Sequence, residues 1–541
     1  MTEEDIQNEL LKKYCRAIVH MRQEIAYARF GLIFGAGIGT PFHFPDWEAL
    51  IKGIAEHPDI AATELLKEKR DHTSMSQILF QYYRAKQIKI RSDKLDLPYN
   101  ELEVDIKAGW IKIVKDVLYK NVTKNDEELK NNDTYILSYI NIMKNRVTVN
   151  FNFDNTIERL LFVTRTKKNT RGYKTIYTDN VPQIPDTSII YHPNGFLPIK
   201  SSEKTSRDLI FLEDSFQDQL IGGILGHYAF LVNHLAQQTC LFIGHSLGDA
   251  TVKHLLRHNS IHNPGQYHYF ISYSETGLNG EGSERDPIFD VNFNVYNLIT
   301  MFLNNEEILA LGNLLSMEDE EFKWRVECIG GYNTYKYFVT GSVAIGKSTI
   351  VSNFKNLTTH EEWLDPLIDG MEKDPSFVEP EGVEKIDKFI AEQVALKNAI
   401  LDQRSSGIYI VDRCPLDAFG FTKNNLWKEK AELLRSKINP GLANRKLCPG
   451  HIIFMVGDPG VIAVRALAAN KKTDEEKLKI QQEKLKYVYI KFEKGVSVID
   501  IRDKNVSQVV KEVAKVIHKN DYIEAPMDEK LSQYEKGIFD D

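Results

Sequence analysis

Runs of consecutive apolar residues alternate with segments of helical periodicity along this 541-residue chain. Within residues 3–29, apolar side chains recur at steps of three and four, which predicts one amphipathic helix. Short continuous apolar runs are typical of strands that are buried on both faces of a parallel sheet. Such runs predict strands at 30–34, 147–151, 188–191, 240–243, 269–272, 335–339, 408–411, 452–456 and 496–499.

Helical segments separate these strands, notably at 216–238 and 249–257. Because strands alternate with helices, the sequence predicts an α/β fold with mainly parallel sheets, Rossmann-like in its first half. Gly330-Gly331 is the expected joint between two such units. We expect an N-terminal domain over 1–330 with a helical insertion at about 50–145, a second α/β domain over 331–520, and a loosely ordered acidic tail over 521–541.

Composition limits the classes of function. A hydrophobic fraction of 42% and a charged fraction of 27% are ordinary for a folded soluble chain, and the net charge of −8 disfavours a general nucleic-acid binder. No apolar run reaches 18 residues, so no membrane span is expected, and without a signal-peptide pattern we expect a cytoplasmic protein. The cysteines stand singly, which argues against a zinc ribbon: Cys15, Cys240, Cys328, Cys414 and Cys448.

Residues 341–348 fit the pattern GxxxxGK[ST] without a mismatch, between a predicted strand and a predicted helix. Gly341 and Gly346 would let backbone N–H groups surround a phosphate, and Lys347 would reach the β- and γ-phosphates. Ser348, with Thr349 beside it, would hold Mg²⁺. We therefore expect ATP or another nucleotide with Mg²⁺ here; the alternative is a glycine-rich turn that arose by chance.

Further motifs follow the other strands of the second unit. Asp412-Arg413 comes directly after 408–411, and Arg465 precedes a lysine-rich segment at 471–487. This layout resembles deoxynucleoside and thymidylate kinases over about 335–518. The resemblance implies that Asp412 and Arg413 position the nucleoside and that Arg465 belongs to a lid over the phosphates. It also implies a carboxylate near Glu361-Glu362-Trp363, without deciding which one.

Structural alternatives stay open for the second unit. Asp412 and Arg413 could form a surface ion pair. The lysine-rich segment is also rich in glutamate, so it could be a solvated helix face.

The first predicted strand is also followed by glycines, in Gly35-Ala36-Gly37. Alone, these glycines could serve packing between a strand and a helix. Four other motifs open a helix or follow a strand, and the carboxyl ends of parallel strands are where α/β sheets bind ligands. These motifs are Pro45-Asp46-Trp47-Glu48, Asn152-Phe153-Asp154, Tyr191-His192-Pro193-Asn194-Gly195 and Gly244-His245-Ser246-Leu247.

In order and context, this set resembles the sirtuin family, especially the sirtuin-like NADases of bacterial antiphage defence, over about 28–260. The resemblance implies that Asn152 orients the nicotinamide ribose or the attacking water, that Asp154 holds the carboxamide, and that His192 is the base or a ribose contact. It further implies pyrophosphate contacts at Gly35, Ala36 and Gly37, an adenosine contact at Ser246, and NAD contacts at Asp46, Trp47, Asn194 and Gly244.

The sequence departs from this family at two positions. The family places its histidine directly before the loop glycine, where this chain has Asn194, and Gly39 stands where serine is common. Helix capping by Asn152 and Asp154, and an ordinary buried role for His192, are the structural alternatives. Residues 244–248 also fit GxSxG, the nucleophile elbow of α/β-hydrolases, with His262 or His268 as a partner.

The missing cysteines of the sirtuin zinc module favour water as the acceptor, and thus hydrolysis of NAD to nicotinamide and ADP-ribose. Together, the two resemblances imply an NADase gated by a nucleotide-sensing or nucleotide-phosphorylating domain in abortive-infection defence. A homo-oligomer and a phage-derived activator are the expected partners, with neither a membrane nor nucleic acid. The alternatives are a (deoxy)nucleotide kinase whose first domain binds NAD or ADP-ribose without hydrolysing it, and a ligand-gated scaffold.

Overall fold

The computed structural model divides into two compact units. Unit 1 comprises Met1–Lys13, Glu24–His262 and Tyr267–Glu318; unit 2 comprises Tyr14–Gln23, Asn263–Gln266 and Asp319–Asp541. The structure describes the chain except for residues 1, 69, 93–98, 123–128, 130–134, 145, 165–171, 179–180, 183, 201–203, 207–208, 216–227, 281, 372–378, 404–405, 439–445, 470–472, 493 and 540–541.

Unit 1 is built on a parallel sheet. In the described part of the chain its strand order is β3-β4-β2-β1-β5-β6-β7. The order reverses at β1, which pairs with β2 on one side and β5 on the other, so the carboxyl ends of these three strands border a topological switch point. The strands are β1 (Phe30–Phe34), β2 (Val147–Asn150), β3 (Tyr173–Ile176), β4 (Ser188–Tyr191), β5 (Thr239–Ile243), β6 (His268–Tyr273) and β7 (Leu298–Leu303).

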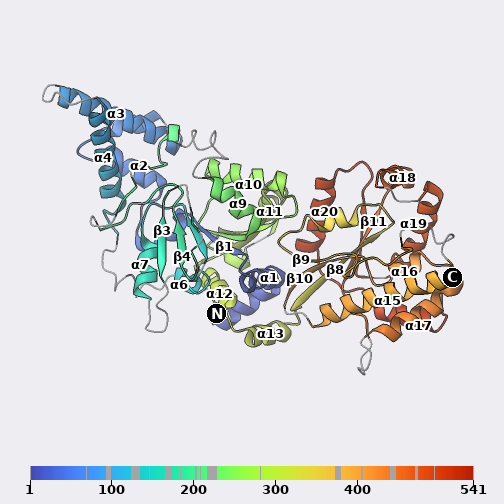
Figure 1. The fold of residues 1–541 in the computed structure, drawn as a ribbon. Helices are drawn as coiled ribbons and strands as arrows, with labels where there is room; N and C mark the ends of the chain where they lie inside the picture. The colour runs from blue at the N-terminus through green and yellow to red at the C-terminus, as the bar shows by residue number, and fades with distance from the viewer. Residues whose placement is uncertain are drawn as a thin grey trace. The chain divides into compact units, whose positions relative to one another are not determined.

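Helices cover this sheet, and α2, α3 and α4 form a separate helical group (Figure 1). Helices α9, α10 and α11 lie together, while α6 packs with α12. The helices are α2 (Trp47–Glu56), α3 (His72–Ser92), α4 (Tyr99–Leu118), α6 (Ile136–Tyr139), α7 (Thr156–Val163), α9 (Ala229–Gln237), α10 (Ala250–His262), α11 (Gly282–Tyr296) and α12 (Asn305–Ser316), with 3₁₀ turns η1 (Ala36–Phe42), η2 (Thr63–Glu68) and η3 (Gly277–Asn279). Helix α1 (Glu3–Ala26) is divided, because its residues Tyr14–Gln23 belong to unit 2.

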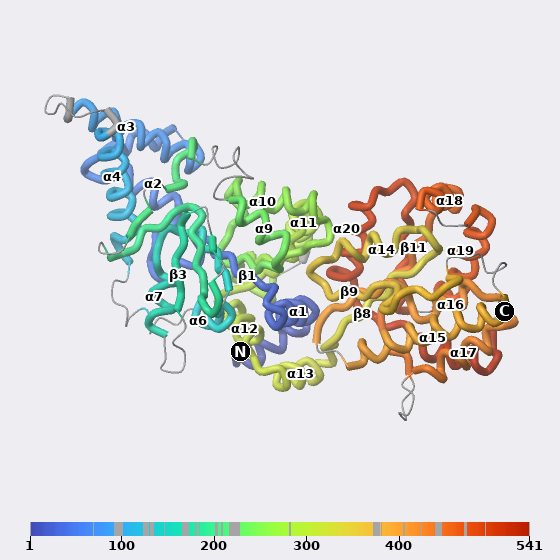
Figure 2. The backbone as a smooth tube through the Cα atoms, in the orientation of Figure 1, coloured from blue at the N-terminus to red at the C-terminus, as the bar shows by residue number. Residues whose placement is uncertain are grey.

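Unit 2 has a second parallel sheet, with the order β12-β11-β8-β10-β9 among the described residues. Here β8 lies between β11 and β10, and helices α15 and α17 pack side by side (Figure 2). The elements are α13 (Asp319–Cys328), β8 (Thr334–Gly341), α14 (Lys347–Val351), β9 (Thr358–His360), α15 (Pro380–Asp402), β10 (Gly407–Asp412), α16 (Asp417–Gly420), η5 (Asn424–Leu426), α17 (Trp427–Lys437), β11 (His451–Val456), α18 (Pro459–Ala468), α19 (Glu475–Tyr489), β12 (Val496–Asp500), α20 (Val506–His518) and α21 (Met527–Glu535).

Two parallel sheets with flanking helices confirm the predicted fold class. Each predicted strand is present, and the structure adds β3, β7 and β9. The helix predicted at 216–238 corresponds to α9, with residues 216–227 outside the described part. No helix in the described part of the chain combines the length and apolar character needed to cross a membrane.

The expectation of a loosely ordered tail is wrong for residues 527–535. This segment forms α21, which packs against α17. Met527, Leu531 and Tyr534 are buried in the core of unit 2. Their steps of four and three place them on one helical face, and the burial of that face stabilises the helix despite its acidic surroundings.

Candidate functional site

The turns after β1 and β5 contact each other closely. The Gly35 N–H donates to the carbonyl of Ile243, and the Gly37 N–H donates to that of Gly244, both at 2.9 Å. A Cβ on Gly35 would lie 2.7 Å from the Gly244 oxygen. Gly244 itself has a φ of +76°. These glycines therefore serve packing. Of the three residues expected at the pyrophosphate, Gly35 and Gly37 have their N–H groups engaged inside the unit, while Ala36 and Gly37 remain exposed.

Asn152 lies against this glycine turn. Its side-chain Nδ2 donates to the Gly35 carbonyl at 3.0 Å, and the residue is half-buried. The contact joins the carboxyl ends of β1 and β2, as expected for neighbouring parallel strands. The structure thus brings Asn152 to the glycine turn, with its amide partly open to solvent.

His192 is fully buried beneath that edge. Its Nδ1 lies 2.8 Å from the backbone oxygen of Asn152, and its Nε2 lies 2.9 Å from Oε1 of Glu158. The backbone oxygen of Asn152 is an acceptor, and so is Glu158 in its carboxylate form, so both ring nitrogens then donate and the ring is an imidazolium. Burial lowers the pKa of His192, but the charge and hydrogen bond of Glu158 outweigh it, and the net pKa is raised.

This arrangement departs from the role of base predicted for His192. A base needs an unprotonated nitrogen within reach of its substrate, and neither ring nitrogen is available here. His192 instead holds the Asn152 backbone in place. Glu158, which completes the pair from α7, was missed by sequence reasoning; its Oε1 also accepts from Thr175 Oγ1 at 2.9 Å.

Asp154 lies two residues before α7, whose N-cap residue is Asn155. It is buried, and its Oδ1 accepts from the Thr156 N–H at 2.9 Å. Burial raises the pKa of Asp154, and the hydrogen bonds from Thr156 oppose that rise. The contact of Asp154 with the carboxamide stays a prediction, and α7 has no side-chain cap of its own.

Asn194 is buried at the position where a histidine was expected. Its Nδ2 donates to the Phe151 carbonyl at 3.2 Å, and its Oδ1 accepts from the Tyr228 hydroxyl at 3.0 Å. The following Gly195 has a φ of +110°, a conformation that favours glycine. Asn194 therefore ties the loop after β4 to the end of β2.

Asp46 and Trp47 belong to the helical group of unit 1. The Asp46 carboxylate caps α2 by accepting from the Ala49 N–H at 2.7 Å. The Trp47 ring stacks on Phe211 with centroids 5.5 Å apart and on His72 at 6.3 Å. These contacts give both residues structural roles, and their predicted NAD contacts stay predictions.

Ser246 is exposed beside the glycine turn, and its Oγ accepts from the Gly248 N–H at 3.1 Å. Left-handed backbone occurs at Gly244 and Leu247, whereas Ser246 lacks the strained conformation of a nucleophile elbow. His268 is buried and bonded to the Cys240 N–H. The hydrolase alternative therefore lacks its serine–histidine contact among the described residues.

In unit 2 the glycine loop joins β8 to α14. Gly341 and Gly346 have φ values of +151° and +105°. The buried Lys347 Nζ donates to the carbonyls of Gly341 at 3.1 Å and Ser342 at 3.0 Å. Burial lowers the pKa of Lys347 to about 8. The ammonium is thus folded back on its own loop, while Ser348 and Thr349 are exposed at the start of α14.

A charged cluster follows β9 and β10. Arg413 contacts Glu362 at 2.5 Å and Asp417 at 3.9 Å, between the rings of Trp363 and Phe421. Arg413 has a φ of +73°, which aims it into this cluster from the end of β10. Its ion-pair partners are Glu362 and Asp417, so Arg413 does not form the alternative surface ion pair with Asp412. Which carboxylate would act on a nucleoside stays a prediction.

Lys397 was missed by sequence reasoning. From α15 its buried Nζ donates to the backbone carbonyls of Glu362 at 3.1 Å and Asp412 at 3.0 Å. Burial lowers the pKa of Lys397 to about 8. Its partners are carbonyls from distant segments, which no local sequence pattern could reveal.

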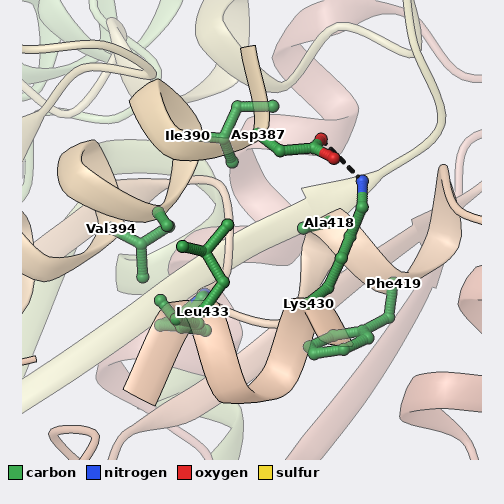
Figure 3. A pocket seen from close by; sticks show the side chains of 10 residues that line it. Asp387, Ile390, Val394, Ala418, Phe419, Lys430 and Leu433 are labelled. Carbon is green, nitrogen blue, oxygen red and sulfur yellow. Dashed lines mark hydrogen bonds and ion pairs between the residues drawn. The ribbon is translucent and has the colours of Figure 1, made fainter. Parts of the chain in front are cut away.

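A small, partly open cavity lies between α15, α16 and α17. Figure 3 shows an ion pair between Asp387 and Lys430, 2.7 Å apart, beside apolar side chains that include Phe419. Phe419 follows the Asp412-Arg413 turn in sequence, so the cavity borders the segment that carries the charged cluster. Its remaining lining is mostly apolar: Ile390, Ala391, Val394, Pro415, Ala418, Leu433 and Leu434.

The predicted lid lies on α18 and α19. Arg465 is exposed on α18, and its action over phosphates stays a prediction. The lysine-rich segment forms α19 from Glu475; residues 471–472 lie outside the described part. Gln481 and Leu485 are buried on α19, so one of its faces packs and the other is solvated.

The first unit is therefore a parallel α/β domain whose glycine turn and polar side chains meet at a switch point of the sheet. Residues 146–298 match the SIR2-like domain family. That segment carries Asn152, His192 and Ser246, and such domains are often NAD-dependent enzymes. No curated protein matches the chain. Among the described residues, no group of three or more histidine, cysteine, aspartate or glutamate side chains is arranged to hold a metal ion.

Proposed function

We propose that unit 1 hydrolyses NAD⁺ to nicotinamide and ADP-ribose. The observation that carries the proposal is the contact of the partly exposed Asn152 amide with the Gly35 carbonyl, at the switch point of a SIR2-like domain. Because glycine has no side chain, a ligand at this edge can approach the backbone of the turn closely. The SIR2-like match supports NAD as that ligand.

Cleavage of the nicotinamide–ribose bond develops positive charge on the ribose. The Asn152 side-chain oxygen can stabilise that charge or orient the water, because its Nδ2 is fixed by Gly35. Water forms the new bond to the ribose carbon, nicotinamide leaves with the bonding pair, and one proton goes to solvent. His192 acts as a positioning residue that fixes the Asn152 backbone.

The test is nicotinamide release by the Asn152→Ala variant. We expect the rate to fall at least about 100-fold, the size of effect that follows removal of one preorganised polar group. Asn141→Ala is the matched control, because Asn141 is exposed and lies in a turn before β2. An Asn152→Ala rate equal to that of the control, with both proteins folded by circular dichroism, would contradict the assignment.

For unit 2 we propose binding of a nucleoside triphosphate with Mg²⁺ at the loop 341–348, and of a nucleoside or nucleotide near Arg413. The left-handed glycines and the buried Lys347 support the first part. The Arg413–Glu362 pair between two aromatic rings supports the second. Bound nucleotide would gate the NADase of unit 1, which we assign to antiphage defence on the resemblance alone.

The gate is tested by measuring nicotinamide release with a panel of nucleoside mono- and triphosphates plus Mg²⁺. We expect release to rise with one nucleotide and to lose that response in Lys347→Ala. The defence role is tested by phage plating on cells with wild-type protein or Asn152→Ala. Equal plating on both would refute that role.

One observation favours the second candidate, a (deoxy)nucleotide kinase with a non-hydrolytic NAD- or ADP-ribose-binding domain. Both ring nitrogens of His192 are engaged, and Asn194 carries an amide in place of an imidazole. This candidate predicts NAD binding by calorimetry without nicotinamide release, and phosphate transfer from ATP to a nucleoside or nucleotide. The NADase proposal predicts release, so the two outcomes separate the candidates.

A further inference from the structure

Helix α10 carries three histidines at steps of four residues, and the proposed function uses none of them. His254, His258 and His262 therefore lie along one helical face. The rings of His258 and His262 lie next to each other, with centroids 4.4 Å apart. His258 is half-buried and His262 is exposed, so solvent reaches both rings.

The two imidazoles are placed so that they could bind a metal ion together. Neither ring forms a hydrogen bond or an ion pair with the described residues, so their ring nitrogens are available. His262 ends α10, where the helix dipole favours a cation.

We propose that His258 and His262 form a two-imidazole site for a late first-row divalent ion such as Zn²⁺. The described residues provide no third histidine, cysteine or carboxylate at this point, so water would fill the other positions. Nitrogen ligands select Zn²⁺, Cu²⁺ or Ni²⁺ over Mg²⁺ and Ca²⁺, which prefer oxygen. The site is thus chemically distinct from the Mg²⁺ position proposed for unit 2.

Calorimetric titration of the full, untagged chain with Zn²⁺ tests the site. We expect one Zn²⁺ per chain, and a loss of affinity of more than about tenfold in both His258→Gln and His262→Gln, since even supporting residues of metal sites are worth that much. His254→Gln is the matched control from the same helix face and should retain wild-type affinity. The absence of Zn²⁺ binding, or one ion per two chains, would overturn the proposal.

A second measurement guards against loss of affinity by misfolding. Electron paramagnetic resonance of the chain with one equivalent of Cu²⁺ should report two nitrogen ligands in the wild type and in His254→Gln. His258→Gln should report fewer, with an unchanged circular dichroism spectrum. Identical copper spectra in all three proteins would refute the assignment, because the ion would then be bound elsewhere.

Discussion

Replacing His192 by glutamine removes the positive partner of a buried ion pair. In the native chain, His192 and Glu158 are 0% and 5% exposed, and their atoms are 2.9 Å apart. Solvent screening is therefore weak for this pair. Because Glu158 stays behind as a buried carboxylate, we expect a loss of about 3–5 kcal/mol in the free energy of unfolding.

The loss should depend on pH. The pKa of His192 is raised above its ordinary value of 6.5 in the folded protein. A raised pKa means that the imidazolium stabilises the fold fully below pH 6.5 and loses that effect as pH rises through the folded pKa. The stability difference between wild type and His192→Gln should therefore be largest in mildly acidic buffer and shrink in alkaline buffer.

Urea unfolding with hydrogen-exchange mass spectrometry measures this difference. Peptides covering 147–163, which contain β2 and α7, report on unit 1 separately from unit 2. Thr175→Val is the control, because it removes only a neutral hydroxyl from Glu158 and should cost about 1 kcal/mol. A loss below that of the control, or one that does not change with pH, would refute the imidazolium assignment.

Three other substitutions test separate parts of the structure. Lys347→Ala should weaken binding of Mg²⁺–ATP more than tenfold by calorimetry, because a phosphate-binding ammonium is lost; full affinity would contradict the phosphate-loop role. Gly35→Ala should lower the free energy of unfolding by about 1–3 kcal/mol in urea, because the added Cβ would lie 2.7 Å from the Gly244 oxygen. An unchanged urea midpoint would contradict the close packing of the two turns. Tyr534→Ala should lower the free energy of unfolding of unit 2 by about 3–5 kcal/mol, because the ring is fully buried. A negligible loss would contradict the packing of α21 in the core.

Strands with long apolar runs could be predicted from the sequence, since burial on both faces leaves a local pattern. β3 and β9 were missed because each is short and has an exposed residue, so neither gives a continuous run. β7 was missed although all six of its residues are buried. It directly follows α11 through Asn297, whose φ of +53° makes the turn without glycine or proline.

The sequence predicted which loops meet at the sheet edge, but not how their side chains pair. Asn152 lies at the glycine turn as the strand pattern indicated. The partner of His192 is Glu158, 34 residues away on a helix, and the partners of Lys397 are backbone carbonyls. Such contacts depend on packing in three dimensions, so spacing along the chain carries no signal for them.

The folded-back Lys347 has a consequence for the speed of the proposed nucleotide binding. Its ammonium donates to two carbonyls of its own loop, and an arriving phosphate must replace both hydrogen bonds. The proposed association would therefore include a rearrangement of the loop after the first encounter, and this step would make it slower than a simple diffusive reaction. In stopped-flow mixing, the observed rate should level off as nucleotide concentration rises, and the plateau gives the rate at which the loop releases its lysine.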